Sequence, residues 1–228
     1  MDTPYALVSH EVTGSTQDDA RALHRGAPVL VTAQRQTVGR GRRGATWETA
    51  PRALAASLAF STDWPAETWS RIPLMAGLSL LPALPGNCEL KWPNDVVVGY
   101  DKAAGILVEG SDGLVVVGVG VNLWWPDAPP GYAGIYEEDC GEEQHGAIAR
   151  DWAERLLGAL SGDPELWGRD EYRRVCGTLG KSITWEPAGA GTAIDVDRDG
   201  ALLVRTGSSV QRLVSGSVWE VRGFESSS

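Results

Sequence analysis

Residues 90–122 read LKWPNDVVVGYDKAAGILVEGSDGLVVVGVGVN. Apolar and β-branched runs alternate in this stretch with short segments rich in Asn, Asp and Gly, which favour turns. The runs are Leu90–Pro93, Val96–Val98, Gly105–Glu109 and Leu114–Asn122. Strands separated by such turns pair as hairpins, so the stretch predicts four consecutive strands of an antiparallel sheet.

The residues before this stretch predict two helices and two strands. One helix is expected from Ser15 to Gly26, because Ser15 or Thr16 can cap its first turn, and another from Pro73 to about Leu81. The second of the two strands is rich in alanine and ambiguous, and we interpret it as buried. The strands are Val29–Ala33 and Ala53–Phe60.

The chain after residue 122 predicts a long loop, two helices and a second group of strands. The loop from Trp124 to Gln144 contains six acidic residues and no Lys or Arg. Apolar residues recur every four positions from Ile148 to Leu160, which indicates an amphipathic helix, and a second helix is expected over Glu165–Val175. The short strands expected at the end are Ser182–Glu186, Thr192–Val196, Ala201–Thr206, Val210–Leu213 and Ser217–Arg222.

Five short strands so close together fit a small barrel better than a large sheet. We therefore predict an α+β fold in two domains. Residues 1–176 form a mixed, largely antiparallel sheet with flanking helices, and residues 177–228 form a small C-terminal β-barrel.

Composition limits the partners and the compartment. The 228 residues include 20 Lys and Arg against 30 Asp and Glu, a formal net charge of −10, and such acidity repels the phosphates of nucleic acid. No apolar run is long enough to span a bilayer, and residues 1–9 lack the features of a targeting signal, so we expect no membrane association and a cytoplasmic protein. Three widely spaced cysteines suit a reducing compartment, and three isolated histidines offer no metal-ligand spacing.

The loop Gly39-Arg40-Gly41-Arg42-Arg43-Gly44 formally satisfies the dinucleotide-binding pattern G-x-G-x-x-G. That pattern needs a helix to begin at its third glycine, but here the chain runs on to Pro51 without a helical pattern, so we reject this interpretation. Arginines on a glycine-rich backbone suit a loop that closes over an anion and donates hydrogen bonds to it. An exposed basic loop is the alternative, since charged runs usually face water.

The run Lys91-Trp92-Pro93-Asn94-Asp95 places Asn94 and Asp95 at a strand junction, where their side chains can point at a ligand. Lys102 follows seven residues after Asp95 and opens an apolar strand. A lysine in that position is either a surface group whose stem lies along apolar neighbours or a charge directed into a site. The residues alone leave both interpretations open.

Taken together, these motifs resemble those of the biotin protein ligases. That family has an early Ser-Thr-Asn, a Gly-Arg-Gly-Arg-x-Gly-Arg-x-Trp loop, a Lys-Trp-Pro-Asn-Asp run followed by Lys-x-x-Gly-Ile-Leu-x-Glu, and a Gly-x-Gly-x-Asn strand end. The matching segments, in the family's order, are Ser15–Gln17, Gln36 with Gly39–Trp47, Lys91–Asp95 with Lys102–Glu109, and Gly118–Asn122. Two departures stand out: Gln17 replaces Asn but keeps an amide, and Ala45 replaces the second loop arginine and removes a charge.

The resemblance implies a class II synthetase-like catalytic domain, an SH3-like C-terminal barrel and a reaction in two steps. The carboxylate of biotin attacks the α-phosphate of ATP, which enters with Mg²⁺, and the product is biotinyl-5'-AMP. A lysine of a biotin carboxyl carrier protein domain then attacks this mixed anhydride. The loop 39–44 would fold over the adenylate and keep water out, and no metal site built from protein ligands is implied.

The resemblance also implies three overlapping sets of site residues. The catalytic set is Lys102, Arg40, Arg42 and Asp95. The biotin-binding set is Ser15, Thr16, Gln17, Gln36, Arg40, Gly41, Arg42, Trp47, Lys102, Gly105 and Leu107. The nucleotide-binding set is Arg40, Arg42, Arg43, Lys91, Asn94, Lys102 and Asn122, with Trp124 or Trp125 available to stack on the adenine.

Three other functions compete with this hypothesis. A lipoate or octanoate ligase shares the fold but needs an apolar pocket, whereas Ser15, Thr16, Gln17 and Gln36 are polar. A biotin-sensing repressor that binds DNA is disfavoured by the net charge and by ligase motifs that begin as early as Ser15. A catalytically inactive biotin-binding module is favoured only by Ala45.

Overall fold

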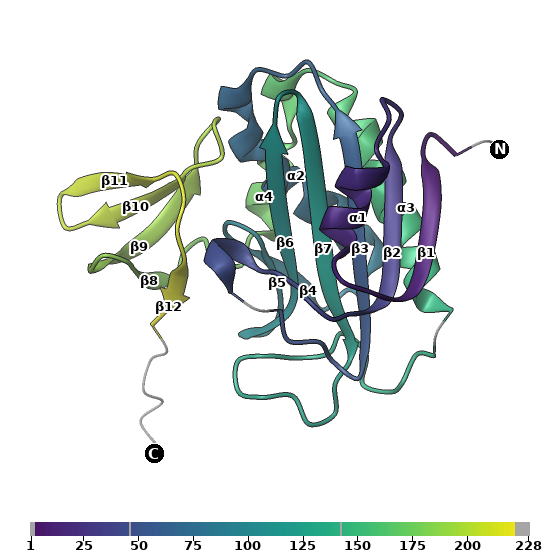
Figure 1. Ribbon diagram of the computed structural model, residues 1–228. Coiled ribbons are helices and arrows are strands. Elements are labelled where there is room, and N and C mark those ends of the chain that lie inside the picture. Colours follow the sequence, from purple (N-terminus) through teal and green to yellow (C-terminus); the bar gives the residue numbers. More distant parts are fainter. Residues whose placement is uncertain (1–2, 46, 142, 222–228) are drawn as a thin grey trace.

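The computed structural model describes residues 3–45, 47–141 and 143–221, with the backbone but not the side chain of Arg43. Its larger sheet has seven strands in the order β1-β2-β3-β7-β6-β5-β4 (Figure 1). Strand β1 runs parallel to β2, whereas each of the other neighbouring pairs is antiparallel. The strands are β1 Ala6–Thr13, β2 Val29–Gln36, β3 Arg52–Ser61, β4 Cys88–Lys91, β5 Asp95–Val98, β6 Asp101–Ser111 and β7 Leu114–Trp124.

The mixed, largely antiparallel sheet is the one that the sequence predicts. The four runs of residues 90–122 form consecutive antiparallel strands, β4 to β7, and the ambiguous alanine-rich segment is strand β3. Strand β1 was not predicted. It lies at the edge of the sheet with several exposed side chains, so its sequence lacks the apolar alternation of a half-buried strand.

Helices cover both faces of this sheet, because successive strand residues point to opposite sides. Leu30, Leu58 and Val117 belong to the main core, which includes residues of α2 (Ile72–Leu80) and α3 (Gln144–Leu160). The alternate positions of β2, β3 and β7 form a smaller core with Ala20 of α1 (Thr16–Leu23). Figure 1 shows α1 in front of the sheet and α2 and α3 behind it.

Two helices differ from the prediction. Helix α1 ends at Leu23 rather than near Gly26, and Ser15 stands at its N-cap without a side-chain capping bond. The helix expected over Glu165–Val175 is two pieces, a 3-10 turn η4 (Pro164–Leu166) and α4 (Arg169–Val175). Gly168 lies between them with φ +88°, a left-handed conformation that a continuous right-handed helix cannot contain. Three more 3-10 turns are η1 (Arg42–Gly44), η2 (Ala66–Arg71) and η3 (Leu81–Ala83).

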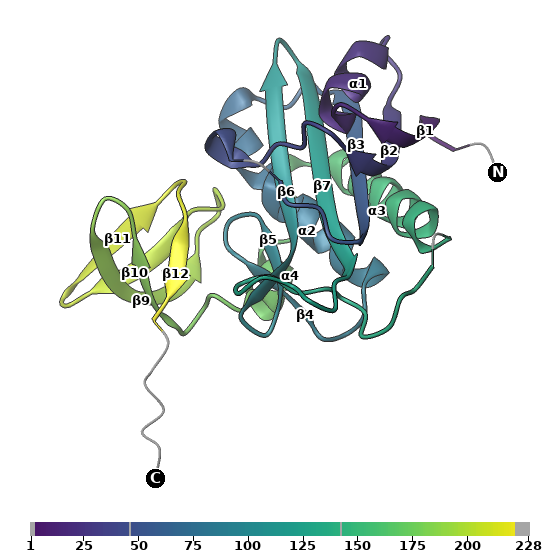
Figure 2. The same cartoon turned by 60° about the horizontal axis from the view of Figure 1, so that its bottom comes forward.

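A second sheet of five antiparallel strands follows, in the order β11-β10-β9-β8-β12. The five strands expected there are confirmed, but the predicted SH3-like barrel is not, and the division at residue 176 stays a prediction. Figures 1 and 2 show this sheet beside the β4–β6 half of the larger one, away from β1. The strands are β8 Ser182–Trp185, β9 Gly189–Val196, β10 Leu202–Thr206, β11 Ser209–Leu213 and β12 Val218–Glu220.

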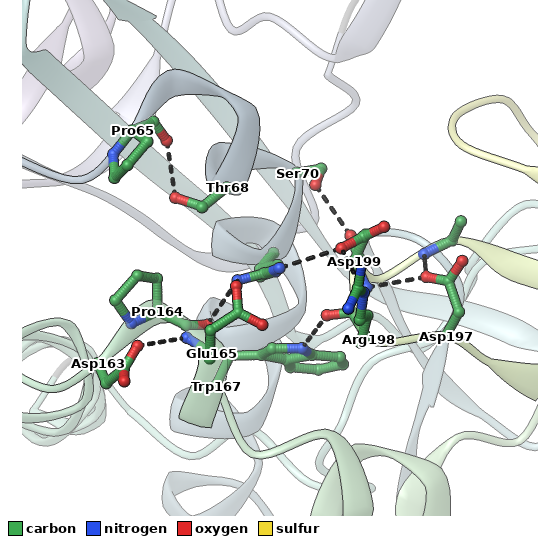
Figure 3. Close-up of polar contacts among 12 residues, drawn as sticks. Pro65, Thr68, Ser70, Asp163, Pro164, Glu165, Trp167, Asp197, Arg198 and Asp199 are labelled. Carbon is green, nitrogen blue, oxygen red and sulfur yellow. Dashed lines mark hydrogen bonds and ion pairs between the residues drawn. The ribbon is translucent and has the colours of Figure 1, made fainter.

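Polar contacts join the two sheets at the loop between β9 and β10 (Figure 3). Arg71, only 3% exposed, donates to Glu165 at 2.9 Å and to Asp199 at 3.1 Å. The indole of Trp167 donates to the carbonyl oxygen of Arg198 at 2.7 Å. The second sheet is therefore docked on the first by buried, directional bonds. None of the helices in the described ranges is long and apolar enough to cross a membrane.

Candidate active site

Two glycines of β7 open a cavity between the sheet and α1. A Cβ atom at Gly118 would stand 2.6 Å from Oε1 of Gln17, and one at Gly120 would stand 2.7 Å from the ring of Trp47. Side chains at these positions would fill the space, so the Gly-x-Gly pattern of the strand is what keeps it open. The cavity has an empty volume of about 480 Å³. Its lining consists of Ser15, Thr16, Gln17, Gln36, Arg40, Gly41, Arg42, Trp47, Ala56, Ser57, Asn94, Lys102, Gly105, Ile106, Leu107, Gly118, Val119 and Gly120.

One end of this cavity, here called the head pocket, is lined by polar side chains that carry no charge: Ser15, Thr16, Gln17, Gln36 and Ser57. The oxygen Oε1 of Gln36 accepts from the backbone N–H of Thr16 at 2.8 Å, and Oγ1 of Thr16 lies 2.8 Å from Oγ of Ser57. The amide of Gln17 donates through Nε2 to Glu109 at 3.2 Å.

Two polar atoms of the head pocket are buried and have no hydrogen-bond partner in the described part of the chain. They are Oγ of Ser15 and Oε1 of Gln17, on residues that are 3% and 4% exposed. A buried polar atom without a partner is costly. The arrangement therefore fits a ligand that supplies the missing hydrogen bonds.

The other end of the cavity is cationic. Nζ of Lys102 lies 2.6 Å from Oδ1 of Asp95 and 5.7 Å from the ring centroid of Trp47. Nη1 of Arg42 donates to Oδ1 of Asn94 at 2.7 Å. Lys102 thus lines the cavity, as the second interpretation of its position predicts, and its role there stays a prediction.

A second cavity, here called the outer cavity, begins at this cationic end and has an empty volume of about 620 Å³. It shares Gly41, Arg42, Trp47, Asn94 and Lys102 with the first cavity. Its other lining residues are Ala45, Glu48, Asp95, Tyr132 and Ser217. Two spaces therefore meet at Lys102 and Arg42.

The loop of residues 39–47, here called the Gly-Arg loop, lies over the junction of the cavities. The N–H of Trp47 donates to the carbonyl of Gly39 at 3.1 Å, which closes the loop on itself. Arg40 makes a bidentate pair with Asp18 at 2.7 and 3.0 Å and lies 3.7 Å from Glu109. The hydrogen bond to Asp18 raises the pKa of Arg40 above its already high ordinary value, so this guanidinium stays charged.

The structure brings most of the predicted site residues together. The whole predicted biotin-binding set lines the first cavity, and Asp95 lines the outer one. Lys91 lines neither. Asn122 is fully buried and lines neither cavity. Its Nδ2 donates to the carbonyl of Lys102 at 3.4 Å, and its Oδ1 has no hydrogen-bond partner in the described part of the chain. The Arg43 side chain and Thr46 lie outside the described residues.

The sequence interpretation missed several lining residues. Ser57 lies in an apolar strand where nothing marks it, but Gly118 and Gly120 belong to a quoted motif and were not assigned to the site. Tyr132 and Ser217 come from distant segments that only the fold brings to the outer cavity. Neither Trp124 nor Trp125 lines the first or the outer cavity, although the ring of Trp125 lies 5.7 Å from that of Tyr132.

No group of three or more His, Cys, Asp or Glu that could hold a metal ion occurs within the described ranges. The expectation that Mg²⁺ enters with ATP rather than in a protein-built site stays a prediction.

Solved structures of biotin protein ligases share this architecture. The enzyme of Aquifex aeolicus, in complex with biotin and ATP, matches with a TM-score of 0.79 and 24% sequence identity, over 96% of this chain and 99% of that one. The biotin acetyl coenzyme A carboxylase synthetase of Helicobacter pylori, with bound biotinylated ATP, gives a TM-score of 0.64 at 23% identity, over 95% and 99%. At these identities the likeness defines the fold class, which is that of the biotin protein ligases.

Sequence comparison identifies the family. The model of the biotin/lipoate A/B protein ligase family matches residues 10–122. The biotin--[acetyl-CoA-carboxylase] ligase of Mycobacterium tuberculosis is 32% identical over 92% of this chain and 87% of its own length. The bifunctional ligase/repressor BirA of Bacillus subtilis is 26% identical over 93% and 73%. The chain therefore belongs to the biotin/lipoate A/B protein ligase family.

Proposed function

We propose that this protein is an ATP-dependent biotin--[acetyl-CoA-carboxylase] ligase. It activates biotin as biotinyl-5'-AMP and transfers the biotinyl group to a lysine of a biotin carboxyl carrier protein domain. The family, and the relative of that name over most of both chains, support this activity. Three free cysteines suit a reducing compartment, and we place the reaction in the cytoplasm. We assign catalysis to residues 1–176 and treat 177–228 as the C-terminal domain.

The head pocket suits the ureido ring of biotin, which is uncharged and carries both N–H donors and a carbonyl acceptor. Oε1 of Gln17 can accept from a ring N–H, and the hydroxyl of Ser15 can donate to the ring carbonyl. The dithiolane ring of lipoate offers neither group, and it would leave these buried atoms unpaired. The head pocket therefore favours biotin over lipoate.

The meeting of the two cavities at Lys102 and Arg42 is the observation that carries this proposal. Adenylation brings a carboxylate and a phosphate together, so negative charge accumulates where the two substrates meet. Two cations fixed at that point stabilise the charge in the transition state more than in the separate substrates. Asp95, 2.6 Å from Nζ of Lys102, positions the ammonium group.

The protein needs no covalent intermediate of its own for this reaction. The cavities hold the two substrates in line, and the fixed cations lower the barrier. Mg²⁺, entering with ATP, would supply positive charge to the departing pyrophosphate. The Gly-Arg loop then shields the mixed anhydride from water until the carrier lysine attacks it.

A transfer assay tests the proposal. The protein is incubated with ATP, Mg²⁺, biotin and a biotin carboxyl carrier protein domain, and the carrier is analysed by mass spectrometry. We expect a mass gain of one biotinyl group that depends on ATP and is lost when the acceptor lysine is replaced by arginine. A gain with lipoate but not biotin would establish the alternative ligase, and no gain with either would overturn the assignment.

A further inference from the structure

The carboxylate of Glu109 lies next to the head pocket and contacts the amide of Gln17. Glu109 is a residue of β6 and lines neither cavity. Its Oε2 accepts from Nε2 of Gln17 and from Nη2 of Arg21, each at 3.2 Å. The same oxygen lies 3.7 Å from Nη2 of Arg40 in the Gly-Arg loop. One carboxylate oxygen thus faces a residue of the head pocket and two guanidinium groups.

The amide of Gln17 offers only its oxygen to a ligand. Its nitrogen Nε2 has two acceptors, Glu109 and the carbonyl oxygen of Val116 at 3.4 Å, so both amide hydrogens are used. Its oxygen Oε1 is buried, has no partner in the described part of the chain and lies beside Gly118 of the cavity lining. Position 17 is therefore an acceptor for the ligand and not a donor.

Glu109 is the group that fixes this orientation. A primary amide that turns over exchanges its oxygen and its nitrogen. Turned over, Gln17 would place Oε1 against the carboxylate of Glu109 and the carbonyl of Val116, and none of these oxygens has a hydrogen to share. The contact with Val116 is the longer of the two, so the carboxylate contributes more to holding the amide.

The ligase resemblance does not itself predict this contact. Gln17 stands where the resembling motif has Asn, so its amide lies one methylene farther from the backbone. Glu109 ends the motif Lys102–Glu109, but the sequence interpretation gave it no role in the site.

We propose that Glu109 is a positioning residue that sets the specificity of the head pocket. It holds the Gln17 amide with the oxygen towards the ligand, so that the pocket selects a ring with an N–H at this point. A ring with an oxygen there would place lone pairs against lone pairs and be rejected. This inference rests on the proposed function, because that function places the ureido ring of biotin in the head pocket.

Two analogues of biotin test the selection. They are the cyclic carbamates in which one or the other ring N–H is replaced by oxygen, which keeps the shape and turns one donor into an acceptor. Calorimetry measures the Kd of biotin and of both carbamates for wild type, Glu109→Gln and Arg21→Gln, and thermal melting confirms folding. Both variants remove the ion pair between Arg21 and Glu109, but only Glu109→Gln gives the Gln17 amide a neighbour that can also donate. Arg21→Gln is therefore the matched control.

We expect wild type to bind at least one carbamate at least about 100-fold more weakly than biotin. In Glu109→Gln the Gln17 amide can turn over and donate to the ring oxygen, so this ratio should fall at least about 10-fold. In Arg21→Gln it should stay within about 2-fold of wild type. A ratio that Glu109→Gln leaves unchanged, or that both variants lower equally, overturns the proposal, even if the affinity for biotin falls.

A double-mutant cycle tests whether Glu109 acts through Gln17. Gln17→Met keeps the length of the side chain and removes the amide, so adding Glu109→Gln to it should change the Kd of biotin by less than about 2-fold. A larger change would mean that Glu109 acts by another route. Wild type that binds no biotin would contradict the proposed function, whereas wild type that binds biotin and both carbamates equally would overturn only the role of Glu109.

Discussion

Lys102 illustrates at the residue scale how tertiary contacts assign a role. Its place before an apolar strand is compatible with a surface group, but its Nζ lies 2.6 Å from Oδ1 of Asp95 and 5.7 Å from the ring centroid of Trp47. Lys91, in the motif that precedes it, has the same charge and faces neither cavity. We therefore expect Lys102 to act in the site and Lys91 to have no part in it, although both are lysines of neighbouring motifs.

The two lysines make a direct comparison. Lys102→Ala removes a cation from the junction, and we expect biotin-dependent pyrophosphate exchange to fall at least about 100-fold, the scale of losing one transition-state donor. Lys91→Ala should stay within about 3-fold of wild type, because its charge lies outside the site. The measurement is the rate of biotin-dependent pyrophosphate exchange in each variant. A small loss in Lys102→Ala, or a large one in Lys91→Ala, would contradict this assignment.

We expect the absence of a side chain at Gly118 to matter as much for biotin affinity as the polar residues around it. Gly118→Ala puts a methyl group 2.6 Å from Oε1 of Gln17, so the amide must move from its present position. We expect biotin affinity, measured by calorimetry, to fall at least about 10-fold. Gly86→Ala is the control, since a Cβ there meets nothing within 4 Å. Unchanged affinity in Gly118→Ala would show that the amide does not contact the biotin ring.

Burial makes the cysteines poor nucleophiles. It raises the pKa of Cys88 to about 11, and it also raises the pKa of Cys140 and Cys176. At pH 8 the thiolate fraction of Cys88 is then about 100-fold lower than that of an ordinary protein thiol. We expect native protein to react with a disulfide reagent at least about 10-fold more slowly than denatured protein, with the rate rising towards pH 11. Equal rates in the two states would contradict this.

At the scale of elements, the Gly-Arg loop is held by contacts with three other parts of the chain. Arg40 pairs with Asp18 of α1, Arg42 bonds to Asn94 before β5 and to Gly216 beyond β11, and Trp47 packs against the glycines of β6 and β7. The loop carries a turn, η1, but none of the described residues between Gly44 and β3 lies in an α-helix, in agreement with the rejection of the dinucleotide-binding interpretation.

Loosening this loop should release the reactive intermediate. Arg42→Gly removes the bonds to Asn94 and Gly216, so we expect biotinyl-adenylate to escape and to label bystander proteins such as serum albumin. Streptavidin blotting of albumin incubated with the variant, ATP and biotin measures this. Arg25→Gly, an exposed arginine that bonds only to nearby backbone in the described structure, serves as the control. Bystander labelling at the control's level would contradict a shielding role for the loop.

At the scale of the whole molecule, the contacts around Arg71 and Asp199 bind the two sheets into one unit. A guanidinium that is 3% exposed needs its carboxylate partners, since an unpaired buried charge is unfavourable. The catalytic and C-terminal parts should therefore unfold together.

Asp199→Asn tests these contacts between the two sheets, because it keeps the shape of the side chain and removes its charge. We expect a loss of about 1–2 kcal/mol in the free energy of unfolding, limited by the partial exposure of Asp199, and a single cooperative transition for wild type. Asp170→Asn, whose carboxylate is 80% exposed and pairs with Arg173, should cost less than about 0.5 kcal/mol. Two separate thermal transitions in wild type would show that the sheets unfold independently.

Residues 90–122 were sufficient to predict the central hairpins, because local alternation records them directly. The family resemblance, and the residues that line the first cavity, came from the motifs at 15–17, 36–47, 91–109 and 118–122. Edge strand β1 and the break at Gly168 were not predictable in this way. An exposed edge strand has weak apolar alternation, and a left-handed glycine inside a helical pattern looks like any other glycine until its φ is known.

The order of residues along the chain thus determined which chemistry is present: polar groups for an uncharged ring, cations for a phosphate and glycines for close approach. The tertiary structure alone decided which of these groups meet. It brought Lys102 and Arg42 to the junction of two cavities, left Lys91 outside, buried Asn122 and placed Ser217 in the lining of the outer cavity. The physical reason is that contacts between distant segments depend on how the two sheets pack, and no local pattern of side chains encodes that packing.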